Sequence, residues 1–120
     1  MEKNKFENLE AWKEAHKLVI MVYEITKNFP PDEKYRLVDQ LCRSSSSVAA
    51  NLVEGNSRGH RKEFIQYEYQ SRGSLEETKY HLLLAKDLSL LKSDEYNGLQ
   101  DQANKTGKLI NGLITFLKNN

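Results

Sequence analysis

The chain has 120 residues, of which 38% are hydrophobic and 29% charged, and its formal net charge at pH 7 is +1. This length is that of one domain with one hydrophobic core, and the aromatic and branched residues are too frequent for an intrinsically disordered chain. The near-neutral charge gives no support to a nucleic-acid-binding protein, although a local basic patch remains compatible with it.

A single cysteine, Cys42, excludes an intrachain disulfide. Its apolar neighbours favour a small buried residue over a reactive thiol. Residues 1–17 contain no apolar run of signal-peptide length, and no run approaches the roughly 20 apolar residues of a membrane span. We therefore expect a cytoplasmic protein.

Four segments carry apolar residues at steps of four and three, which is the spacing of one face of a helix. The steps alternate throughout, except for one irregular step near Gly73 and Ser74 in the third segment. Pro30 and Pro31 separate the first segment from the second, because proline starts helices readily and interrupts them elsewhere. The turn signals Asn56–Gly59 and Lys92–Asp94 mark the other two boundaries. The predicted helices span roughly residues 6–28, 32–57, 60–91 and 94–118.

The spacing assigns a buried stripe to each helix, and no alternating strand pattern competes with it. Short connections between long helices imply antiparallel neighbours. Residues 1–120 are therefore predicted to form a single all-α domain, an antiparallel up-down-up-down four-helix bundle. The four stripes are Ala11, Ala15, Leu18, Val22, Ile25, Phe29; Val38, Leu41, Ser45, Val48, Leu52; Phe64, Tyr67, Ser71, Leu75, Thr78, Leu82, Ala85; and Tyr96, Leu99, Ala103, Thr106, Ile110, Leu113, Leu117.

Two helices have more apolar surface than one stripe can bury. Val19–Tyr23 is apolar on all sides of the first helix, and Leu82–Ala85 is so on the third. These residues either lie half-exposed at the rim of the bundle or contact other subunits, and the second reading predicts a closed homo-oligomer. The predicted oligomer interface comprises Ile20, Met21, Tyr23, Gly73, Ser74, Leu83 and Leu84.

Small residues mark a place where two backbones approach closely. Ser44–Ser47 form a run of serines, and Gly73 lies in the middle of the third helix, where glycine costs about 1 kcal/mol relative to alanine. The close approach is either a helix crossing inside one subunit or a contact between subunits.

No group of residues has the spacing of a catalytic, metal or cofactor site. Glu77 and His81 are four residues apart, but a di-iron bundle needs two Glu-x-x-His repeats and two more carboxylates. Cys42 could join them as a nucleophile, yet nothing in the spacing requires it. We therefore predict no enzymatic activity, no metal, no cofactor and no small-molecule substrate.

A basic cluster follows the end of the second predicted helix. The cluster consists of Arg58, His60, Arg61 and Lys62. It is either a solvated turn whose local ion pairs contribute little to stability, or a patch that contacts phosphate groups. In an oligomer the patch would recur in every subunit, so that its modest charge would add up. The predicted nucleic-acid or partner contacts are Arg43, Asn51, Glu54, Arg58, Arg61 and Lys62.

Several ordered motifs resemble one known family, the four-helix-bundle proteins encoded in intervening sequences of bacterial 23S rRNA genes. The motifs are FENLEAW at residues 6–12, SVAANLVEG at 47–55 followed by Arg58, RGSLEE at 72–77 and LLLAK at 82–86. The resemblance runs from Phe6 to about Leu117.

The resemblance implies a ring-like homopentamer without known enzymatic activity, often labelled ribosomal because of where its genes lie. A related branch, the accessory variability determinant of diversity-generating retroelements, binds nucleic acid but is strongly basic, unlike this chain. We therefore expect a homo-oligomeric scaffold or interaction protein. The alternative is an RNA- or DNA-binding accessory protein that uses the basic cluster.

Overall fold

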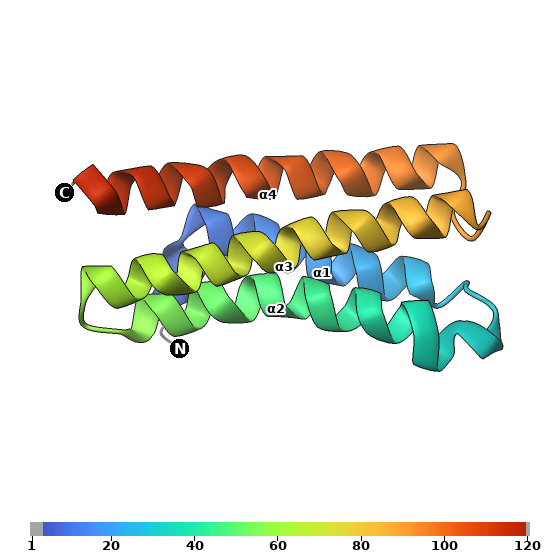
Figure 1. Ribbon diagram of the computed structural model, residues 1–120, viewed down its shortest axis with the longest axis horizontal. Helices are drawn as coiled ribbons and strands as arrows, with labels where there is room; N and C mark the ends of the chain where they lie inside the picture. The colour runs from blue at the N-terminus through green and yellow to red at the C-terminus, as the bar shows by residue number, and fades with distance from the viewer. Residues whose placement is uncertain (1–3, 120) are drawn as a thin grey trace.

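The computed structural model describes residues 4–119 and forms a bundle of four long helices that extends over 45 Å (Figure 1). The helices alternate in direction, and no strand occurs among these residues. α1 and α3 each pack against both α2 and α4. The predicted all-α four-helix bundle is confirmed. Its elements are η1 (Lys5–Asn8), α1 (Glu10–Thr26), η2 (Pro31–Glu33), η3 (Lys34–Val38), α2 (Asp39–Ser57), α3 (Arg61–Asp87) and α4 (Ser93–Asn119).

Each helix turns one stripe of side chains into a common core, as the spacing predicts. Four positions differ by one residue: the buried residues are Thr26, Leu37, Glu68 and Ile114, whereas the spacing predicts Ile25, Val38, Tyr67 and Leu113. Ile25 and Leu113 pack at the margin of the core instead. Complete burial of one large aliphatic side chain contributes about 1.5–3 kcal/mol. The fully buried leucines are Leu18, Leu41, Leu52, Leu75 and Leu82.

Two backbone breaks shorten the first two helices relative to the predicted ranges 6–28 and 32–57. Leu9 is extended, with ψ 121°, and separates η1 from α1, which ends at Thr26. Arg36 has φ −115° and ψ −106°, so the regular helix α2 begins at Asp39. Pro30 and Pro31 lack the N–H donors of a helix, and the chain resumes through two short, irregular turns.

The third helix ends at Asp87, four residues before the predicted end at Leu91. Ser89 adopts φ 63°. The Leu90 N–H donates to the Ala85 carbonyl over 2.8 Å, and the Ser89 N–H donates to the Lys86 carbonyl over 2.9 Å. These two bonds form a Schellman motif, which usually has glycine where this chain has serine. The missing glycine explains why the sequence does not reveal this helix end.

Hydroxyl groups join α2 to α3 along their crossing. Ser71 Oγ donates to the Val48 carbonyl over 2.7 Å, and Thr78 Oγ1 donates to Ser44 Oγ over 2.9 Å. Both bonds are buried, so each polar group is satisfied inside the core. The serine run 44–47 therefore serves a crossing inside the subunit.

The glycine at this crossing is Gly55 rather than Gly73. A Cβ atom on Gly55 would lie 2.9 Å from Tyr67 Cβ and 3.1 Å from Phe64 Cδ1. A Cβ atom on Gly73 would meet no atom within 4 Å. No other helix of the bundle approaches Gly73 closely, so a helix crossing inside the subunit does not explain this glycine.

Candidate functional site

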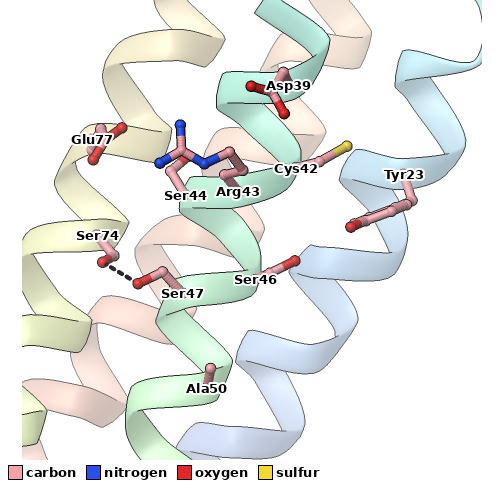
Figure 2. A pocket seen from close by; sticks show the side chains of 10 residues that line it. All are labelled: Tyr23, Asp39, Cys42, Arg43, Ser44, Ser46, Ser47, Ala50, Ser74 and Glu77. Carbon is pink, nitrogen blue, oxygen red and sulfur yellow. Dashed lines mark hydrogen bonds between the residues drawn. The ribbon is translucent and has the colours of Figure 1, made fainter. Parts of the chain in front are cut away.

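An open groove runs over the outer face of α2, between α1 and α3 (Figure 2). Its floor is made of small side chains, and Tyr23 of α1 and Glu77 of α3 form its two sides. Figure 2 shows Tyr23 pointing from α1 toward α2, and Arg43 extending from α2 on the side of α3. The lining residues are Tyr23, Asp39, Cys42, Arg43, Ser44, Ser46, Ser47, Ala50, Ser74 and Glu77.

Hydrogen bonds fix the floor of this α2 groove. Ser47 Oγ and Ser74 Oγ are 2.8 Å apart, and Asn51 Nδ2 donates to the Ser47 carbonyl over 2.9 Å. Arg43 is exposed, and within residues 4–119 it has no hydrogen bond or ion pair. The groove therefore offers a rigid, shallow floor and one uncommitted cation to an incoming surface.

Cys42 does not come together with Glu77 and His81 to form a nucleophilic site. Cys42 Sγ lies 3.9 Å from Thr26 Oγ1 on α1, while His81 Nε2 lies 3.2 Å from Glu77 Oε2 on α3. Burial raises the pKa of the Cys42 thiol, which keeps it protonated at neutral pH. The thiol is therefore neither paired with a base nor activated.

Among the described residues, no group of three or more His, Cys, Asp or Glu side chains is placed to hold a metal ion. The same part of the chain contains no helix that is long and apolar enough to cross a membrane.

The basic cluster at the α2–α3 turn is partly neutralised by carboxylates. Arg58 Nη2 lies 3.5 Å from Glu54 Oε1, and Arg58 Nε lies 4.0 Å from Glu63 Oε2. Arg58 also donates to the Tyr67 hydroxyl over 2.7 Å and stacks over that ring. The hydrogen bond to Tyr67 is the main cause that raises the pKa of Arg58. Arg58 is thus held against the surface of the bundle.

The predicted contact residues divide into two groups. Arg61 and Lys62 are exposed in the first turn of α3, near Glu54 and Arg58. Arg43 lies 15 positions before Arg58, which is about 22 Å along a helix. Asn51 sits between them and bonds to Ser47 in the α2 groove. The turn brings four of the six residues together, and Arg43 belongs to the groove.

The predicted interface residues lie on four different surfaces of the bundle. Ile20 and Met21 line a groove between α1 and α4. Tyr23 and Ser74 line the α2 groove. Leu84 is half-buried in a crevice beside η3. The other two predicted residues, Gly73 and Leu83, are exposed on α3.

Gly73 and Leu83 share an exposed stripe on α3 with Tyr80, which the sequence reading did not select. The spacing of three, four, three and four residues places all its members on the outer side of the helix. Tyr80 is 58% exposed and Leu83 is 40% exposed. The spacing of seven from Gly73 was the signal that could have identified Tyr80. The stripe, called the α3 outer stripe below, comprises Gly73, Glu76, Tyr80, Leu83 and Asp87.

Comparisons with known proteins agree with this architecture. A protein of unknown function from the S23 ribosomal protein family of Bacteroides thetaiotaomicron has a similar structure, with a TM-score of 0.82 and 20% sequence identity. The similarity covers 88% of this chain and 95% of that one. Among curated proteins, none matches this chain by sequence. The model of the 23S rRNA-intervening sequence protein family matches residues 7–112. The chain belongs to the 23S rRNA-intervening sequence protein family.

Proposed function

We propose that the chain works in the cytoplasm as a non-enzymatic homo-oligomeric interaction protein, with five subunits arranged in a ring. The observation that carries this proposal is the pair of dissimilar surfaces described above. The α2 groove is recessed and floored by small residues, whereas the α3 outer stripe presents large exposed side chains.

Two different surfaces on one subunit are what a ring requires. In a head-to-tail ring each subunit uses one patch toward one neighbour and another patch toward the next. Tyr80 and Leu83 on α3, with Ile20 and Tyr23 on α1, expose apolar area that the isolated bundle leaves uncovered. Tyr80 and Leu83 are neighbours on α3, three residues apart, and an exposed apolar patch is typical of a protein–protein contact.

The mass of the protein in solution tests this proposal. Light scattering at micromolar concentration is expected to give five times the chain mass of 13.9 kDa. The double variant Tyr80→Glu, Leu83→Glu is expected to lose this mass and keep its helical circular dichroism. Each introduced carboxylate would have to be desolvated at the contact, although it costs little on the exposed surface of a single subunit.

Tyr35→Glu is the matched control, because Tyr35 is 85% exposed on η3, outside both surfaces. It should retain the wild-type mass. A wild-type protein that is monomeric at micromolar concentration would refute the oligomer, and a Tyr80→Glu, Leu83→Glu variant of unchanged mass would remove the α3 outer stripe from the interface.

Nucleic-acid binding is the second candidate function, and the start of α3 supports it. His60 precedes the helix without a side-chain cap, so the first-turn N–H groups are open to an anion beside two cations. In the described part of the chain Arg61 and Lys62 have no carboxylate partner. This function is the second candidate because Glu54 and Glu63 add negative charge next to these cations, and because the whole chain has a net charge of only +1.

Arg61→Ala with Lys62→Ala is expected to abolish any binding of single-stranded RNA or duplex DNA and to flatten its salt dependence. Fluorescence anisotropy at several salt concentrations measures both effects. Lys17→Ala with Lys27→Ala removes equal charge from two exposed positions, one in α1 and one directly after it, and should leave binding unchanged. Binding that survives the first pair of substitutions would exclude the start of α3.

A further inference from the structure

One carboxyl group lies entirely inside the bundle. Glu68 on α3 is 0% exposed, and neither of its carboxylate oxygens has a hydrogen-bond partner. A buried polar group without a partner is uncommon, and a buried charge without one is more costly still. Neither the proposed ring nor the candidate nucleic-acid site uses this residue.

The surroundings of Glu68 offer no cation. Its Oε2 atom faces Gly55 on α2 and would lie 3.3 Å from a Cβ atom placed there. Of the charged groups on neighbouring elements, Arg58 is bonded to Tyr67, and Glu14 of α1 accepts from Gln102. Lys118 of α4 lies over the ring of Tyr69. Burial alone raises the pKa of Glu68 to about 8.

We propose that Glu68 is a proton-dependent latch that holds the α2–α3 end of the bundle closed while its carboxyl group is neutral. Ionisation requires water or a cation at the carboxylate. The side that faces Gly55 is near the end of the bundle, because Gly55 lies two residues before the end of α2. Opening on that side separates Gly55 from Tyr67 and displaces the turn that carries Arg58.

The position of the latch links it to the surface next to it. Arg58 N–H donates to the Gly55 carbonyl over 3.2 Å, and its guanidinium bonds to Tyr67, the residue before Glu68. A shift between Gly55 and Tyr67 therefore breaks the contacts that hold Arg58 down. In the open state the released guanidinium is free to pair with the ionised Glu68.

The sign of the pH effect follows from the raised pKa. The unfolded chain releases this proton near the ordinary value of 4.5, whereas the closed bundle keeps it until about pH 8. Between these values the folded state holds one proton more, so folding weakens as pH rises. The unfolding equilibrium constant increases about tenfold for each pH unit in this interval. Above pH 8 the effect levels off.

Carboxyl-carbon NMR of the full-length protein tests the latch directly. With glutamate labelled, one resonance is expected to titrate near pH 8, and it should disappear in Glu68→Gln. Amide hydrogen exchange of residues 55–64 should accelerate more in the wild type than in Glu68→Gln between pH 6 and pH 9, after correction for intrinsic rates. In Glu68→Gln the unfolding equilibrium constant should no longer change tenfold for each pH unit. Glu63→Gln, an exposed control on the same helix, should keep that dependence.

Three results would overturn the proposal. They are a Glu68 resonance that titrates near its ordinary value, equal pH dependence of stability in the wild type and Glu68→Gln, and faster exchange that is not confined to the α2–α3 end. If Glu68→Gln fails to fold, Glu68→Leu takes its place, and the wild-type titration needs no variant. The outcome does not depend on the number of subunits, so failure of the ring proposal remains distinguishable from failure of the latch.

Discussion

Gly55→Leu is expected to lower the free energy of unfolding by about 3 kcal/mol, a large part of the 5–15 kcal/mol typical of a domain. The new Cβ atom alone would lie 2.9 Å from Tyr67 Cβ. A Cβ atom moves only with its backbone, so α2 and α3 must separate to accept the side chain. Urea denaturation followed by circular dichroism measures the loss.

Gly73→Leu is the matched substitution, since Gly73 is also in a helix interior but has no atom within 4 Å of the added Cβ. The same change there should preserve the fold and even favour the helix, by up to about 1 kcal/mol. If the α3 outer stripe contacts another subunit, Gly73→Leu should reduce the mass in solution. If Gly73→Leu keeps both the wild-type mass and the wild-type stability, Gly73 lies at no close contact. If Gly55→Leu and Gly73→Leu lower the free energy of unfolding equally, the result contradicts a close helix crossing at Gly55.

The comparison of these glycines shows what a helical pattern can and cannot provide. Both residues occur inside helices, and glycine is unfavourable at either position for the same reason. Spacing assigns Gly55 to the buried side of α2, three residues after Leu52, and Gly73 to the outer side of α3. How closely a second helix approaches depends on side chains far away in the sequence, in this case Phe64 and Tyr67.

The candidate interaction surfaces were predictable only in part. Surplus apolar residues on the first and third helices indicated exposed area, and Ile20, Tyr23 and Leu83 are indeed among the exposed hydrophobic residues. The sequence does not show that they lie on different faces, because that depends on how each helix is rotated against its neighbours. The same holds for Arg43, which the structure separates from the turn by most of α2.

The third helix shows how a charge can hide a correct pattern. The buried face of α3 passes through Glu68, Ser71, Leu75, Thr78, Leu82 and Ala85, with unbroken steps of three and four. Tyr67, chosen for this stripe from its apolar character, is only half-buried. Periodicity alone favours position 68, but carboxylates are almost never buried without a partner. The position that the predicted stripe omits therefore carries the fully buried carboxyl group.

Glu68→Leu should therefore raise the free energy of unfolding at pH 7 by about 3 kcal/mol, because the folded wild type holds a proton that the unfolded chain has released. Leucine fills a similar volume without a polar group, so the buried face of α3 becomes apolar from position 68 onward apart from two bonded hydroxyls. The gain should shrink toward pH 4.5, where the unfolded chain also keeps the proton. Glu63→Leu on the exposed side of α3 should change stability by no more than about 0.5 kcal/mol. A gain for Glu68→Leu that is the same at both pH values would mean that packing, and not the proton, limits the stability of this bundle.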